Sequence, residues 1–169
     1  MKKNKITVSV VLIVIVSLII INQIVMRKLK SEIIIEASAD EIWNVLLDHQ
    51  AYPTWNPFIK QISGSTTVGE TLEVTIQSEG NKPMAFKPLV LVNRTNEEFR
   101  WIGKLWIKGI FDGEHYFILE DLGSGQTKFI QGEKFKGILS GLMLAMIGKD
   151  TLGGFNAMNG ALKEQVERN

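Results

Sequence analysis

The sequence contains no cysteine and only two histidines, His49 and His115. The absence of cysteine excludes disulfide bonds, thiolate-bound zinc and catalysis by a thiol. Common catalytic and phosphate-binding motifs are missing too, since the chain has no G-x-S-x-G, no phosphate-binding glycine loop and no H-E-x-x-H. We therefore expect no metal and no cofactor, and no catalytic residue can be assigned from a motif.

Acidic residues are absent from the first 30 positions, which carry six basic residues. Residues 31–169 hold thirteen basic and all eighteen acidic residues, for a net charge of −5. Nucleic-acid binding depends on a basic surface that meets the phosphates. The acidic main part of the chain therefore argues against a nucleic acid as partner.

No charge interrupts residues 6–26, a stretch of 21 residues. As a helix this stretch would be about 30 Å long, enough to cross a bilayer. A cleaved signal peptide is the alternative, but residues 22–26 offer no small-x-small cleavage site. We therefore predict an uncleaved membrane anchor in residues 1–29 and a single domain in residues 30–169.

Basic residues flank the predicted anchor on both sides, so the positive-inside rule discriminates weakly. Three lysines and the terminal amine precede it, and Arg27, Lys28 and Lys30 follow it. This small excess favours an inside N-terminus. We expect a single-pass protein of a bacterial cell membrane with its domain on the extracytoplasmic side.

The domain begins with a strand around residues 31–37, followed by two short helices. Ser38 and Glu41 have the spacing of a capping box, which predicts a helix to about Asp48. Pro53 and Pro57 restrict the next helix to a single turn. His49 follows the first of these helices, where an exposed or capping role is expected.

Strand signals then repeat up to residue 135. Leu72, Val74 and Ile76 alternate with polar residues, which is typical of a strand with one buried face. Pro88 lies inside the strand expected at residues 84–94 and indicates an edge or a bulge. The further strands are expected at residues 60–67, 71–78, 98–107, 114–122 and 126–135.

The remaining segment, residues 137–168, has a helical pattern in two unlike parts that meet near Gly148, a candidate hinge. The second part places one apolar stripe at helical spacing, formed by Leu152, Phe155, Met158, Leu162 and Val166. Residues 138–147 are apolar on every side except at Ser140 and Gly141. Either the rest of the domain or a bilayer must cover this first part.

The order of elements resembles the START-like superfamily, also known as the SRPBCC or helix-grip fold, to which the polyketide cyclase/dehydrase-like proteins belong. The motifs that carry the resemblance are residues 35–43 (IEASADEIW), 52–58 (YPTWNPF), 111–115 (FDGEH), 131–137 (QGEKFKG) and 154–159 (GFNAMN). The resemblance implies an α+β fold, with an antiparallel sheet of about seven strands curled round the C-terminal helix. It also implies an apolar cavity between sheet and helix. Members bind lipids, sterols, polyketides and other apolar molecules, and a minority are enzymes without a shared catalytic residue.

Three polar residues are predicted to meet inside this cavity. His115 shares a strand face with Phe117, and Gln131 and Glu133 share one with Phe129. A buried carboxylate and imidazole must pair, become neutral or meet water. A satisfied structural network, recognition of a ligand's polar end and acid–base catalysis all fit this pattern. The full set of candidate ligand-binding residues is Trp55, Phe58, Phe86, Trp101, His115, Phe117, Phe129, Gln131, Glu133, Met143, Phe155 and Met158.

Three functions remain open from the sequence. The first is a membrane-anchored protein that binds a lipid or other apolar small molecule. The second is a cyclase- or dehydratase-like enzyme that uses His115 and Glu133. The third is an interaction or stress-related module whose pocket is vestigial.

Overall fold

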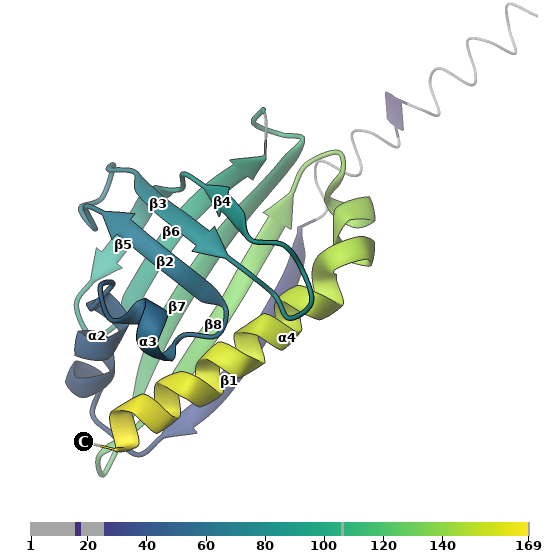
Figure 1. Ribbon diagram of the computed structural model, residues 1–169. Coiled ribbons are helices and arrows are strands. Elements are labelled where there is room, and N and C mark those ends of the chain that lie inside the picture. Colours follow the sequence, from purple (N-terminus) through teal and green to yellow (C-terminus); the bar gives the residue numbers. More distant parts are fainter. Residues whose placement is uncertain (1–15, 18–25, 106, 169) are drawn as a thin grey trace, which may run out of the picture.

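The structure, a computed structural model, describes residues 16, 17, 26–105 and 107–168 (Figure 1). The predicted anchor at residues 6–26 therefore lies almost entirely outside the described residues. Among those that are described, no helix is long and apolar enough to cross a membrane. The anchor remains an expectation from the sequence.

The described chain folds into two antiparallel sheets that enclose one core together with three helices. The five-stranded sheet has the order β1-β8-β7-β6-β5, and the three-stranded sheet has the order β2-β3-β4. In chain order the elements are β1 (Arg27–Ile35), α2 (Ala39–Leu47), α3 (Tyr52–Trp55), β2 (Ile59–Gly64), β3 (Leu72–Ile76), β4 (Met84–Phe86), β5 (Leu89–Arg94), β6 (Glu98–Leu105), β7 (Phe111–Gly123), β8 (Gln126–Lys136) and α4 (Ser140–Glu167).

The strand predicted at residues 84–94 is divided in two, which is why the structure has one strand more than the expected seven. Pro88 separates β4 from β5 because it has no N–H to continue the ladder. Its carbonyl accepts a hydrogen bond from the Leu72 amide at 2.9 Å. Together with an isolated bridge between Thr71 and Leu89, this bond joins the two sheets at their common edge.

Helix α4 lies along the sheet, as the helix-grip arrangement requires (Figure 1). Its predicted stripe is buried at Phe155, Met158, Leu162 and Val166, while Leu152 packs against the core. Asn159 fixes the helix to β1, because its side-chain amide donates to the Ser31 hydroxyl at 2.9 Å. The helix runs without interruption through Gly148.

One glycine of α4 is required by packing, and two others are not. A Cβ on Gly154 would lie 2.2 Å from Cδ2 of Phe58, so the Phe58 ring needs the glycine beneath it. Gly153 and Gly160 have nothing within 4 Å of the same position. Glycine is therefore replaceable on the outer face of the helix but not at residue 154.

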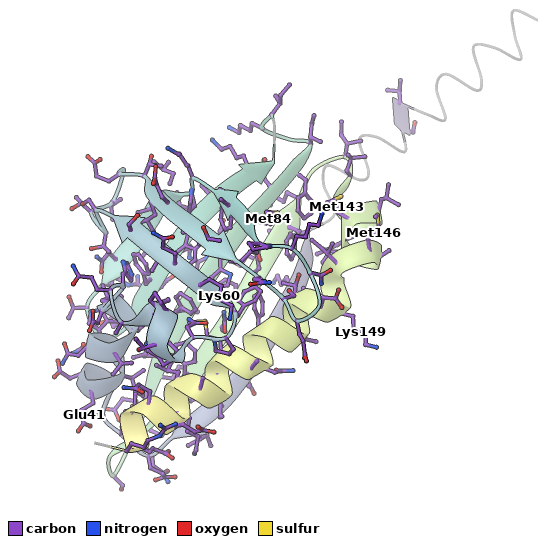
Figure 2. The ribbon with its side chains drawn as sticks, in the orientation of Figure 1. Glu41, Lys60, Met84, Met143, Met146 and Lys149 are labelled. Atoms are coloured by element: carbon purple, nitrogen blue, oxygen red, sulfur yellow. The ribbon has the colours of Figure 1, made fainter. Side chains whose placement is uncertain are left out.

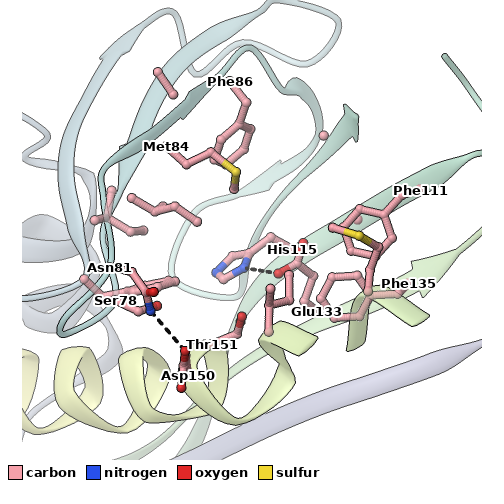
Figure 3. A pocket seen from close by; sticks show the side chains of 18 of the residues that line it. Ser78, Asn81, Met84, Phe86, Phe111, His115, Glu133, Phe135, Asp150 and Thr151 are labelled. Carbon is pink, nitrogen blue, oxygen red and sulfur yellow. Dashed lines mark hydrogen bonds and ion pairs between the residues drawn. The ribbon is translucent and has the colours of Figure 1, made fainter. Parts of the chain in front are cut away.

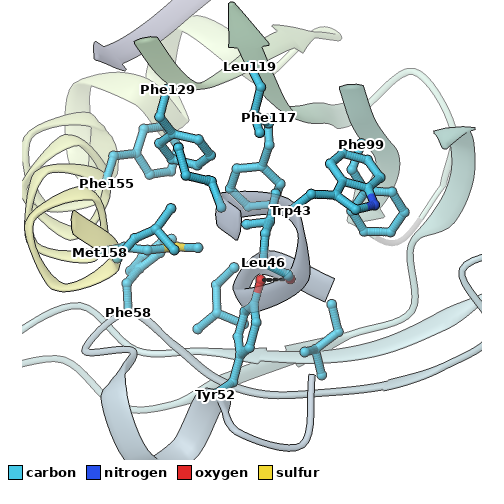
Figure 4. Packing of buried hydrophobic residues seen from close by; sticks show 14 of the residues in the cluster. Trp43, Leu46, Tyr52, Phe58, Phe99, Phe117, Leu119, Phe129, Phe155 and Met158 are labelled. Atoms are coloured by element: carbon cyan, nitrogen blue, oxygen red, sulfur yellow. Dashed lines mark hydrogen bonds between the residues drawn. The ribbon is translucent and has the colours of Figure 1, made fainter. Parts of the chain in front are cut away.

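Helices α2 and α3 close one end of the core. The Ser38–Glu41 capping box forms as predicted and begins α2. The Tyr52 hydroxyl donates to the Leu46 carbonyl at 2.7 Å, which ties α3 to α2 (Figure 4). The expectation for His49 is wrong: its ring is partly buried, because it packs edge-on against Tyr52 and also meets Phe99.

Candidate functional site

A cavity of about 440 Å³ opens between the two sheets and the first half of α4 (Figure 3). Strands β6, β7 and β8 form its floor, and β4 with the turn before it forms the facing wall. Most of the lining is apolar. The lining residues are Phe58, Ile59, Ile76, Ser78, Asn81, Lys82, Met84, Ala85, Phe86, Trp101, Gly103, Lys104, Phe111, Gly113, His115, Glu133, Phe135, Met143, Met146, Ile147, Asp150 and Thr151.

His115 and Glu133 form a polar pair in this lining. They face each other in the β7–β8 register, and Nδ1 of His115 lies 3.7 Å from Oε2 of Glu133. That distance exceeds a hydrogen bond. Both groups therefore keep hydrogen-bonding capacity that a molecule in the cavity can use.

Aromatic rings hold the His115 imidazole in place. Trp101, its partner in the β6–β7 register, stacks on it with ring centroids 4.8 Å apart and planes 11° apart. Phe117 and Phe155 meet the imidazole edge-on. Because these rings leave little room for rotation, the edge that carries Nδ1 stays directed toward Glu133.

A glycine makes room for the carboxylate. Gly113 lies on β7 beside Glu133, and a Cβ there would be 2.2 Å from Oε1 of Glu133. Any other residue at 113 would displace the carboxylate. Gly113 and His115 lie two residues apart on the same face of β7. Because Gly113 has no side chain, the Glu133 carboxylate fits beside His115.

Gln131 supports the imidazole from the core side. Its side-chain nitrogen lies 3.3 Å from Nε2 of His115 and 3.4 Å from the Met158 sulfur. When the amide nitrogen donates to Nε2, the proton of the neutral imidazole is on Nδ1, toward Glu133. The Gln131 oxygen is buried and has no hydrogen-bond partner among the described residues.

The predicted convergence of His115, Gln131 and Glu133 is therefore present, although Gln131 does not line the cavity. The structure divides the aromatic and methionine candidates. Phe58, Phe86, Trp101 and Met143 line the cavity with the polar pair. Phe117, Phe129, Phe155 and Met158 pack in the core beside it (Figure 4). Trp55 packs against this core.

Sequence reasoning missed the residues that border the mouth. The turn between β3 and β4 contributes Asn81, whose amide donates to Oδ2 of Asp150 on α4 at 3.0 Å. This hydrogen bond joins the two walls across the opening (Figure 3). The two residues are 69 positions apart and belong to no motif, so no pattern in the sequence indicated the contact.

A second charged cluster lies on the opposite face of the sheet and is fully paired. Glu98 is buried and bonds to Arg94 and Arg100, and Arg100 also bonds to Glu114. These contacts satisfy the buried carboxylate. The cluster stabilises the sheet and does not reach the cavity.

Solved structures with the same fold include proteins of different activities. The Zhui aromatase/cyclase from Streptomyces sp. R1128 superposes with a TM-score of 0.68 at 15% identity, covering 85% of this chain and 95% of that one. Norcoclaurine synthase from Thalictrum flavum, in complex with dopamine and hydroxybenzaldehyde, gives 0.66 at 19% identity, covering 89% and 92%. A START superfamily protein from Mycobacterium smegmatis gives 0.63 at 22% identity, covering 83% and 97%.

A comparison with curated proteins found no match. The match to a family is broad, since residues 26–167 fit polyketide cyclase / dehydrase and lipid transport. This range contains every strand and helix that forms the cavity. The chain therefore belongs to the polyketide cyclase / dehydrase and lipid transport family.

Proposed function

We propose that the protein is a membrane-anchored binding protein for a lipid or other apolar small molecule with one polar end. The observation that carries the proposal is the mostly apolar cavity of about 440 Å³ with the His115–Glu133 pair in its floor. Ligand pockets commonly have this size and composition. The family description, which includes lipid transport, supports the same class of ligand.

The arrangement favours a hydroxyl or amine at the polar end of the ligand. The Glu133 carboxylate accepts hydrogen bonds, and the Nδ1–H of His115 donates one. Trp101, Phe111 and Phe135 offer ring faces or edges to the apolar body. An uncharged hydrocarbon would leave the buried ends of His115 and Glu133 without a partner, which is unfavourable.

The anchor predicted in residues 6–26 places this cavity at a bilayer. In the proposed orientation the domain is on the extracytoplasmic side of a bacterial cell membrane. An apolar ligand would then be taken from the pool of molecules dissolved in the membrane.

Native mass spectrometry of the full chain, released from detergent, tests the binding function. We expect an apolar molecule at one copy per chain, identified after extraction. Glu133→Gln should weaken its retention by about tenfold, because a charge-assisted hydrogen bond is lost. Glu120→Gln, an exposed change on the neighbouring strand β7, serves as the control. A ligand-free wild-type chain, or equal retention by both variants, would contradict the proposal.

A second candidate is a cyclase- or dehydratase-like enzyme, and the His115–Glu133 pair is the observation that favours it. An imidazole and a carboxylate 3.7 Å apart in an apolar cavity can take up and return a proton at a bound reactive atom. In that case His115→Phe and Glu133→Gln should each abolish turnover of the identified ligand. Unchanged ligand after prolonged incubation with the wild-type chain would exclude catalysis on that molecule.

A further inference from the structure

Large apolar side chains are exposed at the mouth of the cavity. Ile138, Leu142 and Met146 follow one another at intervals of four residues and are 37%, 61% and 69% exposed. Met146 also lines the cavity, and so does Met84, which is 46% exposed on the opposite wall. Figure 2 shows Met84 and Met146 at the same end of the domain.

The loop between β6 and β7 extends this surface. Ile107 is 68% exposed in that loop. The loop is joined to the start of α4, because the Ile138 amide donates to the Gly109 carbonyl at 3.1 Å and the Leu139 amide to the Ile110 carbonyl at 3.0 Å. We call the surface formed by Met84, Ile107, Ile138, Leu142 and Met146 the mouth patch.

Lysines surround the mouth patch. Lys82, Lys104, Lys108 and Lys149 are all exposed. None of them takes part in an ion pair within the described part of the chain. Acidic residues at the same place are Glu79, on the β3–β4 turn, Asp150, which is hydrogen-bonded to Asn81, and Asp112, which accepts a hydrogen bond from the Gly109 amide in the β6–β7 loop.

This composition suits a bilayer better than a protein partner. Lysine is depleted at protein interfaces. A set of apolar side chains bordered by lysines is instead typical of surfaces that insert shallowly among anionic headgroups. The net charge of −5 over residues 31–169 makes the concentration of lysines here a local property and not a general one.

The chain also connects the mouth patch directly to the predicted anchor. Arg27, the first residue of β1, follows the uncharged stretch of residues 6–26. Its guanidinium donates to the Ser140 hydroxyl at 2.9 Å and lies against Gly141 in the first turn of α4. An anchor that ends at residue 26 therefore leaves the membrane beside the mouth patch.

We propose that the mouth patch docks on the anionic surface of the bilayer that holds the anchor, so that an apolar ligand passes between membrane and cavity without crossing water. Leu142 and Met146 enter the headgroup region, and the lysines contact lipid phosphates. This inference rests on the proposed binding function and on the predicted anchor.

Single-cysteine labelling of the full chain tests the docking, and the natural sequence needs no background substitutions because it has no cysteine. Leu142→Cys and Met146→Cys report on the mouth patch. Leu122→Cys is the matched control, since Leu122 is exposed in the β7–β8 hairpin, far from the mouth. Each variant carries an environment-sensitive fluorophore and is reconstituted into vesicles of equal parts phosphatidylcholine and phosphatidylglycerol, with a brominated lipid as quencher.

We expect the brominated lipid to quench the labels at 142 and 146 and to leave the label at 122 unaffected. Lys82→Gln with Lys149→Gln should reduce the docked-to-undocked ratio by roughly fivefold per lysine in these vesicles. The same pair should have no effect in vesicles of phosphatidylcholine alone.

Three results would overturn the proposal in different ways. Equal quenching at 122 and 146 would exclude docking, and ligand retention in native mass spectrometry would show that the binding function still stands. If the chain separates from the vesicles in a flotation assay, both the anchor and the docking are excluded. If the double lysine variant and the wild-type chain have the same docked-to-undocked ratio in both kinds of vesicle, the lysines have no role in docking.

Discussion

Replacing either of two adjacent glycines in α4 by alanine should change stability in opposite directions. Gly153 and Gly154 have the same helical backbone and the same intrinsic preference, so alanine should favour the helix by about 1 kcal/mol at both. Only their surroundings differ. Gly153 faces solvent, whereas Gly154 lies beneath the buried ring of Phe58.

The magnitude follows from the contact at residue 154. A Cβ would lie 2.2 Å and 2.6 Å from two ring carbons of Phe58, and the ring is held edge-on against Phe155. Overpacking of this kind costs about 1–3 kcal/mol. After the gain in helix preference, Gly154→Ala should lower the free energy of unfolding by up to about 2 kcal/mol, while Gly153→Ala raises it by up to about 1 kcal/mol.

Thermal unfolding followed by circular dichroism measures the difference. A gap of about 1–3 kcal/mol corresponds to roughly 2–12 °C between the two melting temperatures for a domain of this size. Because Phe58 lines the cavity, Gly154→Ala should also weaken ligand retention. Equal melting temperatures for the two variants would refute the packing argument.

Two further predictions concern the His49 imidazole and the mouth of the cavity. Burial against Tyr52 and Phe99 lowers the pKa of His49 to about 4, from an ordinary value of about 6.5. Between these two pH values the unfolded chain binds more protons than the folded chain. The free energy of unfolding should therefore fall by up to about 3 kcal/mol as the pH drops from about 6.5 to about 4. Melting temperatures measured over this pH range should show the fall for the wild-type chain and not for His49→Gln. Asn81→Ala removes the exposed hydrogen bond to Asp150 and should change the free energy of unfolding by no more than about 0.5 kcal/mol. The variant should release an apolar fluorescent probe faster than the wild-type chain in stopped-flow measurements. An unchanged release rate would show that this hydrogen bond does not control the opening of the cavity.

The periodicity of apolar residues was sufficient to predict the helices and strands and to predict which face of each strand is buried. The buried stripe of α4 and the Ser38 cap follow from local spacing, and both are present. His115 and Glu133 were expected on inward faces because residues two apart on a strand share a side. Their register across β7 and β8 then brought them together.

The alternation of apolar and polar residues along a strand could not distinguish residues that line the cavity from residues packed in the core. Phe117 and Trp101 both point inward from neighbouring strands, yet only Trp101 borders open space. Phe117 stacks on Phe129 instead. The position and side chains of the facing element decide this outcome, and they are set by contacts between residues far apart in the chain.

The position of Pro88 predicted an edge or a bulge, and the two strands beside it are both edge strands. The prediction did not include the change of sheet that occurs between them. Pro88 offers its carbonyl to Leu72 of another strand at this change of sheet. A proline, which has no backbone N–H to donate, shows where strand pairing stops. It does not show which sheet the chain enters next.

The sulfur-containing side chains at the mouth have a consequence for selectivity. Met84, Met143 and Met146 all border the cavity. Thioether side chains are unbranched and polarizable, and they adapt to irregular shapes by changing rotamer. In the proposed binding function, the aperture would fit molecules of different outline without backbone movement, and discrimination would depend on His115 and Glu133 in the floor. Oxidation of these methionines to sulfoxides would make the same aperture polar and should disfavour passage of apolar molecules.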